Sequence, residues 1–433
     1  MIDQANTGKN KGIFYGWWIL VARLLLSFGW AASPFAIILK PLIDEFHTGR
    51  GEISILASVS SVSGAISAYL VARIIENHSA RKFMLWGSIV GGISFLFCAA
   101  ANSLWQLYVL FFISGIGFSG FAGSVPIVAL ISKWFNRKRG LALGIAWSGF
   151  PLGAMIITPV VGIIASNFGW RATFLFAGIL TLIVSIPILL FVVKDTPEEM
   201  GLLADGDTSR RANNTPAPQA AATKTAPALK KPGLITYFKS WPIWLVGIGF
   251  TLMPMAEMAV VQHEVSFLTD MGISAVLAAS ALGFTSGISG IARWGTGWLA
   301  DKLSPRYVLM LLLGLEIIGI LILLQTNAMS LVWVFAAIWG AASGSFFNIL
   351  PLVIRDVFPP SSFNTVYGFA NSLTIAAMAL GVPLAGFIFD ATGSYHWLFI
   401  LVIIFYVIAM AAIYFTYGIK PRPWKNLPKG DVN

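Results

Sequence analysis

Residues 281–306 read ALGFTSGISGIARWGTGWLADKLSPR, the pattern of a membrane-spanning helix that carries one internal charge. The stretch is largely apolar up to Leu299 and carries no charge there except that of Arg293, and it then becomes charged with Asp301, Lys302 and Arg306. A guanidinium stays charged at biological pH, and placing it in hydrocarbon is costly. We therefore expect Arg293 to face a wet cavity or an anionic partner.

The rest of the chain is also too apolar for an ordinary soluble domain. Its 433 residues are 57% hydrophobic and 11% charged, and the mean hydropathy is +0.80. Apolar stretches of roughly 20 residues, each long enough to cross a ~30 Å hydrocarbon layer as an α-helix, recur about twelve times. Their expected cores are residues 14–37, 53–72, 83–101, 105–131, 140–165, 172–193, 243–268, 275–299, 307–325, 331–354, 365–389 and 396–418. The sequence predicts an all-α polytopic membrane protein with about twelve transmembrane helices.

The basic residues divide unequally between the two sides of such a protein. One side carries Lys9, Lys11, Arg73, Arg81, Lys82, Lys133, Arg137, Lys138, Arg139, the basic residues of 194–239, Lys302, Arg306, Arg355 and those from Lys420 onward. The loops of the opposite side carry Lys40, Arg50 and Arg171. By the positive-inside rule, both termini and residues 194–242 are cytoplasmic. We expect a multi-pass protein of the plasma membrane, specifically a bacterial inner membrane.

This charge pattern and the motif content exclude several other functions. The net charge of +10 follows from the topology, so no nucleic-acid partner is expected, although a basic tail suits anionic membrane lipid. Cys98 is the only cysteine, which rules out an intrachain disulfide and a thiolate metal cluster. No Walker loop, metal-ligand spacing or Ser/His/Asp arrangement stands out. We expect no enzyme activity, cofactor or metal.

The chain is organised as two similar halves. Residues 196–232 interrupt the apolar pattern with prolines among Ala, Thr, Asn and Lys. Residues 68–73 (AYLVAR) resemble 297–302 (GWLADK), and 159–162 (PVVG) resemble 383–386 (PLAG), at a nearly constant offset. This repeat predicts two pseudo-symmetric six-helix bundles around a site near the bilayer midplane. The expected parts are a tail at 1–13, bundles at 14–195 and 243–418, a cytoplasmic linker at 196–242, and a tail at 419–433.

These features resemble the major facilitator superfamily, which has a Gly-x-x-x-Asp-[Lys/Arg]-x-Gly-x-[Lys/Arg] signature after its second and eighth helices. Gly297, Asp301, Lys302 and Arg306 match the second copy, whereas the first copy has Ala72 in place of the acid. The resemblance implies the major facilitator fold. The predicted gating residues are Asp301, Lys302, Arg306, Arg73, Arg137 and Arg139. The alternative for Asp301 is an interfacial anchor.

A second stretch indicates which branch of this superfamily the chain resembles. Residues 133–149 read KWFNRKRGLALGIAWSG, which is similar to the fifth-helix signature of monocarboxylate transporters and the related oxalate/formate antiporters. Taken alone, the same residues form a basic anchor followed by a packing face of small residues. The resemblance implies that Arg293 binds a substrate carboxylate as a bidentate, charge-assisted pair. The alternative is permanent pairing with a protein acid, but Ser289 occupies the position where the family often has one.

The eleventh expected span bears on the charge of the substrate. Tyr367, Gly368 and Phe369 resemble the antiporters, which carry a lysine where this chain has Thr374. A single cation suits a monoanion such as lactate or pyruvate better than a dianion such as oxalate. The predicted substrate-binding residues are Arg293, Asn371, Ser372, Thr374, Asn348, Ser119 and Phe150. The alternative for the polar members of this set is hydrogen bonding between helices.

Proton coupling is predicted at ionisable residues of span 243–268. Glu257, His263 and Glu264 are the candidates, since buried carboxyls hold protons and imidazole titrates near neutrality. The alternatives are pairing of Glu257 with Arg23 and an interfacial position for His263 and Glu264. Glu316 receives no role.

The sequence as a whole favours a monomeric secondary transporter that moves small organic monocarboxylates with protons by alternating access. Three alternatives stay open: a carboxylate exchanger that also accepts dicarboxylates, a proton-coupled efflux carrier, and a receptor that kept the fold without transport.

Overall fold

The chain folds into helices, and no β-strand occurs in the part that the structure describes. The computed structural model describes residues 14–31, 35–75, 78–136, 138–206, 241–326, 328–359 and 363–418, apart from the side chains of residues 119–121, 139–140, 206, 301, 347–348, 363–365 and 418.

The elements before residue 207 form the N-terminal half. They are α1 (Tyr15–Ala31), α2 (Phe35–Phe46), α3 (Arg50–Ile74), α4 (Ala80–Cys98), α5 (Leu104–Gly115), the π-helix η2 (Ile116–Phe121), α6 (Ser124–Trp134), α7 (Arg139–Pro187), the π-helix η3 (Ile188–Val192) and the short 3₁₀ turns η4 (Pro197–Met200) and η5 (Ala204–Gly206). The two 3₁₀ turns lie within the predicted linker. Asp205 accepts a hydrogen bond from the Asn136 backbone N–H at 3.0 Å, so this part of the linker packs on the half that precedes it.

The elements after residue 240 form the C-terminal half. They are α10 (Trp241–Asp270), α11 (Ala275–Lys302), α12 (Pro305–Leu324), α13 (Met329–Ala342), α14 (Phe346–Val357), α15 (Phe363–Thr392) and α16 (His396–Gly418). The remainder of the predicted linker, residues 207–240, and both predicted tails lie outside the described residues.

The helices make about twelve passes through an apolar layer, which confirms the predicted fold class. Eight helical segments of the described chain are individually long and apolar enough to cross a membrane. One of them, Leu141–Val192, is counted once although Gly169 breaks it with φ 79°. The other passes are α4 and two pairs of shorter helices, α5 with α6 and α13 with α14.

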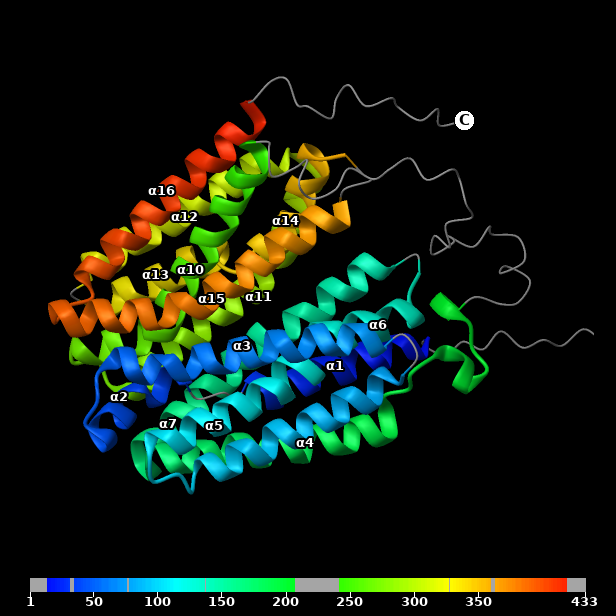
Figure 1. Cartoon of the computed structure of the whole chain (residues 1–433), viewed down its shortest axis with the longest axis horizontal. Helices are drawn as coiled ribbons and strands as arrows, with labels where there is room; N and C mark the ends of the chain where they lie inside the picture. The colour runs from blue at the N-terminus through cyan, green and yellow to red at the C-terminus, as the bar shows by residue number, and fades with distance from the viewer. Residues whose placement is uncertain are drawn as a thin grey trace, which may run out of the picture.

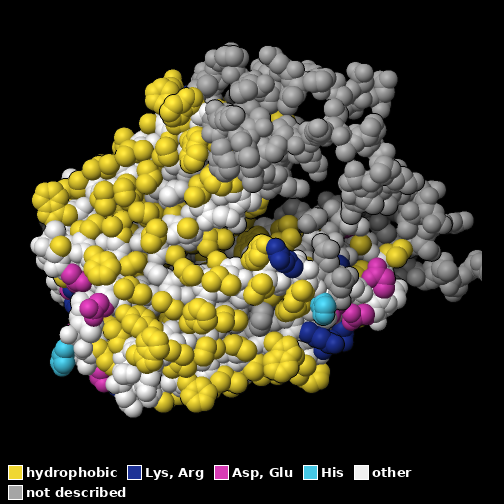
Figure 2. All heavy atoms as spheres, viewed as in Figure 1, with side chains coloured by type: hydrophobic (Ala, Val, Ile, Leu, Met, Phe, Trp, Pro, Cys, Tyr) yellow, Lys and Arg dark blue, Asp and Glu magenta, His cyan; other side chains and the backbone are white. Residues whose placement is uncertain are grey.

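The two halves lie side by side as separate bundles (Figure 1). They contact each other through α3 against α15, α7 against α11 and α2 against α10. We call the end at which α1 begins, α10 begins and α16 ends the linker end, and the opposite end the far end. Apolar side chains cover the middle of the face in Figure 2, and charged side chains gather toward its two ends, as expected for a membrane belt.

The contacts between the halves concentrate toward the far end. A buried apolar cluster there includes Leu39, Ile53 and Phe174 from the N-terminal half together with Leu268 and Ala278 from the C-terminal half. On the linker-end side of these contacts, Ile291, Trp294 and Trp298 of α11 are each more than half exposed, at 51%, 52% and 59%. The structure therefore shows the far end closed.

Small residues set how closely the helices approach. A Cβ atom at Gly381 of α15 would lie 2.2 Å from the backbone oxygen of Met255 of α10, whereas one at Gly368 of the same helix would meet no atom within 4 Å. We expect Gly381→Ala to lower the free energy of unfolding by about 1–3 kcal/mol because the helices must separate. Thermal unfolding in detergent measures this effect. The matched variant Gly368→Ala should leave the melting temperature unchanged or higher, and equal melting temperatures for the two variants would contradict the prediction.

Candidate functional site

Arg293 lies where the contact between the halves ends. One turn earlier on α11, a Cβ atom at Gly290 would lie 3.2 Å from the Pro151 ring of α7. Arg293 follows this contact on the linker-end side of α11 and is half-buried. Its guanidinium lies against Gly344, where a Cβ atom would be 2.2 Å from Nη2 of Arg293. The arginine thus sits beside a glycine at the boundary between the two halves.

The helix break next to Arg293 is built by residues 343–345. Gly344 has φ +71°, a left-handed conformation that glycine adopts without strain. The break separates α13 from α14 and frees backbone groups that a continuous helix would use internally. Ser289 of α11 donates a hydrogen bond to the carbonyl oxygen of Ser343 at 2.8 Å, so the position that lacks the family's acid ties α11 to the break.

Glu257 of α10 supplies the negative charge that α11 lacks. Its side chain is only 6% exposed. It interacts electrostatically with Arg293 and lies close to the Gly344 backbone N–H. Arg23, the partner considered from the sequence, instead hydrogen-bonds Ser27 and lies 4.7 Å from the Trp30 ring centre. The structure therefore corrects the partner of Glu257 from Arg23 to Arg293.

The other predicted substrate-binding residues are dispersed. Phe150 is 50% exposed and adjoins Pro151, close to the turn of Arg293. On α15, Asn371 is half-buried and Ser372 is exposed, donating to the Gly368 carbonyl at 2.9 Å. Thr374 is fully buried and donates to the carbonyl of Phe250 at 2.9 Å, which favours the interhelical alternative for this residue. The side chains of Ser119 and Asn348 lie outside the described residues.

The predicted gating residues lie at the linker end. The Lys302 ammonium is 3.9 Å from the Trp298 ring centre, and the Arg306 guanidinium is 4.2 Å from that of Tyr414. Arg73 is exposed and hydrogen-bonds Tyr69. The side chains of Asp301 and Arg139, and the whole of Arg137, lie outside the described residues.

The N-terminal half has its own acid near this end, in a position that the signature did not indicate. Asp195, just after η3, accepts hydrogen bonds from Ser79 and from the Arg81 backbone N–H, the latter at 2.9 Å. It thereby caps the N-terminus of α4. A capping acid is thus present although the signature position itself is Ala72.

His263 and Glu264 are buried between helices near the far end. Each side chain is 1% exposed. Glu264 accepts a long hydrogen bond of 3.4 Å from Thr285 of α11, and its second oxygen has no hydrogen-bond partner. The packing of neighbouring helices at the far end encloses both residues. Their burial could not be deduced from their position within the span.

His263 belongs to a hydrogen-bonded network that closes the far end. Its Nε2 lies 3.0 Å from the Val382 carbonyl, which can only accept, so Nε2 carries the proton. Its Nδ1 then accepts from the Tyr395 hydroxyl at 2.9 Å. Burial raises the pKa of that hydroxyl to about 12, so it remains a donor. Tyr395 in turn accepts from Arg50 at 2.7 Å.

Ion pairs join the two halves at the same place. Asp270, the last residue of α10, lies 2.8 Å from the Lys40 ammonium and 2.7 Å from the Arg50 guanidinium. Asp390 of α15 accepts hydrogen bonds from the backbone N–H groups of Arg50 and Gly51 at 2.8 Å and 2.7 Å. A carboxylate of one half thus caps the first turn of α3 in the other. We call Lys40, Arg50, Asp270, Asp390 and Tyr395 the far-end clasp.

The sequence contains a signal for this clasp in its unusually placed basic residues. Lys40, Arg50 and Arg171 are the basic residues predicted for the side that positive charge avoids. The structure pairs all three with acids, Arg171 with Glu45 at 3.0 Å. Basic residues on the side that is otherwise poor in positive charge therefore indicate ion pairs with acidic residues at the ends of other spans.

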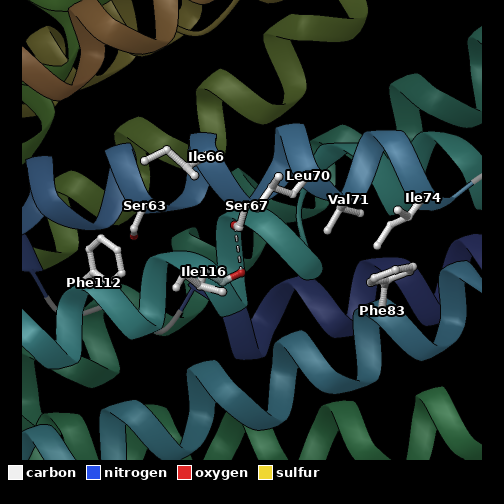
Figure 3. Close-up of a pocket in the computed structure, with 9 residues that line it drawn as sticks. All are labelled: Ser63, Ile66, Ser67, Leu70, Val71, Ile74, Phe83, Phe112 and Ile116. Atoms are coloured by element: carbon white, nitrogen blue, oxygen red, sulfur yellow. Dashed lines mark hydrogen bonds between the residues drawn. The ribbon is translucent and has the colours of Figure 1, made fainter.

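The described structure also contains an apolar groove of about 330 Å³ on the N-terminal half (Figure 3). It is lined by Ser63, Ile66, Ser67, Leu70, Val71, Ile74, Phe83, Phe112 and Ile116. Ser67 donates to the Ile116 carbonyl at 3.4 Å, as the dashed line in Figure 3 marks. With no charged group in its lining, the groove does not suit a carboxylate. Within the described residues, no group of three or more His, Cys, Asp or Glu residues is arranged to hold a metal ion.

Comparisons with known proteins agree with this architecture. The family model described as Major Facilitator Superfamily matches residues 19–373 and 296–432. The chain is 25% identical over 400 residues to human monocarboxylate transporter 2, covering 89% of this chain and 82% of that protein. It is 26% identical over 402 residues to the uncharacterised MFS-type transporter YcxA of Bacillus subtilis strain 168, covering 90% and 92%.

Solved structures share the fold at low sequence identity. A bacterial homologue of the human lysosomal transporter Spinster, in an inward-facing and occupied conformation, matches with a TM-score of 0.69 at 15% identity, covering 94% of this chain and 98% of that one. A mutant of the nucleoside transporter NupG matches with a TM-score of 0.70 at 14% identity, covering 94% and 100%.

Proposed function

Because the chain belongs to the Major Facilitator Superfamily, we propose that this membrane transporter carries small organic monocarboxylates together with protons. The observation that carries the proposal is the placement of Arg293 beside the Gly344 break, with Glu257 as its electrostatic partner. The similarity to monocarboxylate transporter 2 supports the same substrate class.

The pair of Arg293 and Glu257 provides a way to couple the transport of the substrate anion to that of a proton. Without substrate, the carboxylate of Glu257 balances the charge of the guanidinium. A substrate carboxylate can replace it by forming a bidentate pair with Arg293. Glu257 then loses its counter-ion inside a low-dielectric site and takes up a proton. One monoanion and one proton therefore bind together.

The closed far end indicates how the site is reached. With the clasp formed, access to Arg293 is from the linker end, which the positive-inside rule assigns to the cytoplasm. The chain also shares its fold with a Spinster homologue that was solved in an inward-facing conformation. We propose that a monomer in the plasma membrane alternates between this conformation and one in which the far end opens.

Uptake of radiolabelled lactate into proteoliposomes under an inward proton gradient tests the proposal. Accumulation that follows the gradient supports symport. Uptake that occurs only against a preloaded acid such as oxalate or succinate would favour the second candidate, a carboxylate exchanger. A requirement for Glu257 without one for Arg293 would instead favour an efflux carrier for lipophilic cations.

Glu257→Gln should uncouple the proton from the substrate. Glutamine keeps the shape of the side chain but cannot ionise, so we expect gradient-driven accumulation to fall at least about tenfold. Exchange of labelled for unlabelled lactate at equal pH should persist because Arg293 still binds the anion. Measuring both fluxes in the same vesicles separates coupling from binding.

Glu52 offers a matched control for this substitution. It is an exposed carboxyl in the first turn of α3, away from Arg293. Glu52→Gln should retain both fluxes. If Glu257→Gln accumulated lactate as the unmodified protein does, Glu257 would not be the coupling residue.

A further inference from the structure

Glu316 is a buried carboxyl that the proposed transport cycle leaves unused. It lies within α12, which packs against α13 and α16, and its side chain is 0% exposed. Neither carboxylate oxygen makes a hydrogen bond of standard geometry, and the Tyr406 hydroxyl is the group placed to donate to this carboxyl. An ionised carboxyl at such a position is costly, so it requires either a nearby cation or a proton.

Polar groups from three other helices converge on this carboxyl. They are Tyr406 of α16, Trp339 of α13 and Glu257 of α10, all of them buried. The Tyr406 hydroxyl, Trp339 Nε1 and Glu257 Oε2 likewise make no hydrogen bond of standard geometry. Glu316 interacts electrostatically with both Glu257 and Tyr406, and Tyr406 lies within interacting range of Trp339. We call these four residues the inner cluster.

Charge balance assigns a proton to the inner cluster. The charged groups that face it are the two carboxyls and, through Glu257, the guanidinium of Arg293 on α11. If both carboxyls ionised, two negative charges would share one positive charge in a buried site. Because Arg293 interacts with Glu257, that carboxyl is the one that can ionise. Glu316 is left without a cation among the groups it interacts with.

We propose that Glu316 is a proton-binding site that stays occupied in the substrate-free carrier, while Glu257 is ionised beside Arg293. This proposal rests on the proposed function for its role in transport. A neutral Glu316 leaves the charge of Arg293 available to a substrate anion, whereas an ionised Glu316 would repel the anion. The resident proton is therefore distinct from the transported one, and a single proton accompanies each monoanion.

Infrared spectroscopy of the purified, substrate-free protein near neutral pH tests the assignment directly. Protonated carboxyls and ionised carboxylates absorb at different frequencies. The spectrum of the unmodified protein minus that of Glu316→Gln should contain the carbonyl band of a protonated carboxyl. The matched control, Glu257→Gln, should instead remove carboxylate bands. Loss of carboxylate bands in Glu316→Gln would overturn the proposal.

A second variant keeps the test decisive if Glu316→Gln fails to fold. Tyr406→Phe retains the carboxyl and removes one hydroxyl that can donate to it. The same carbonyl band should then move to higher frequency, since hydrogen bonding lowers it. An unmoved band would overturn the contact with Tyr406 on which the inner cluster depends.

Transport assays separate this proposal from the proposed function. Because glutamine has the shape and neutrality of a protonated glutamate, Glu316→Gln should transport lactate within about threefold of the unmodified protein. Absence of lactate transport by the unmodified protein would reject the proposed substrate and leave the infrared result standing. Loss of transport in folded Glu316→Gln would show that the carboxyl must ionise, against the inference.

Discussion

Replacing Arg293 by glutamine is expected to reduce proton-driven lactate uptake at least about 100-fold. The variant loses two charge-assisted hydrogen bonds to the substrate carboxylate, each contributing about 1.5–3 kcal/mol in a buried site. Glutamine also leaves Glu257 without its electrostatic partner. Arg293→Lys should recover little of the loss because a point charge cannot reproduce the planar, two-donor geometry.

Arg355→Gln is the matched control for this prediction. Arg355 is an exposed arginine in the last turn of α14, and it is not among the predicted site or gating residues. Initial uptake rates over a range of lactate concentrations measure both variants. Loss in Arg293→Gln with retention in Arg355→Gln supports anion binding at the boundary between the halves. Equal retention in both would remove the central premise of the proposed function.

The fold was predictable because its main determinant is local composition. A stretch of about 20 apolar residues crosses a membrane as a helix almost regardless of its neighbours. The interruptions were less predictable. The π-helix at Ile116–Phe121 and the break at Gly344 lie inside apolar stretches, and their positions depend on what the neighbouring helices offer. Periodicity within one span contains no such information.

The candidate site was predictable in part, again from local composition. Arg293 stood out because a charge in an apolar run is rare wherever the run lies. Its partner was not deducible: Glu257 is on another helix, and the sequence suggested Arg23 as its cation. The clasp was missed because Asp390 and Tyr395 become meaningful only when α15 is placed against the start of α3. Side-chain contacts between different helices can be predicted only when the arrangement of the helices is known.

Removing the carboxylate of Asp390 is expected to open the far end. Asp390→Ala deletes the two hydrogen bonds that hold the first turn of α3 to α15. At about 1.5–3 kcal/mol for each charge-assisted bond, the closed form loses enough free energy to shift the equilibrium at least tenfold. Ser58 of α3 is half-buried and donates a hydrogen bond to the Ala379 carbonyl of α15, across the boundary between the halves. A cysteine at this position, in a Cys98→Ala background, reports the opening through its labelling rate with a membrane-impermeant maleimide applied from the far end.

Glu45→Ala separates the clasp from a general loss of surface charge. Glu45 and Arg171 form an ion pair at the same end, but both belong to the N-terminal half, so breaking it leaves the contact between the halves intact. We expect labelling at least about tenfold faster in Asp390→Ala and unchanged in Glu45→Ala. Equal labelling in the two would mean that apolar packing, such as that of Leu268 and Ala278, closes the far end without the clasp. A carrier that must reopen this end in each cycle needs a closure that is strong but reversible, and a small number of hydrogen bonds between halves meets both requirements.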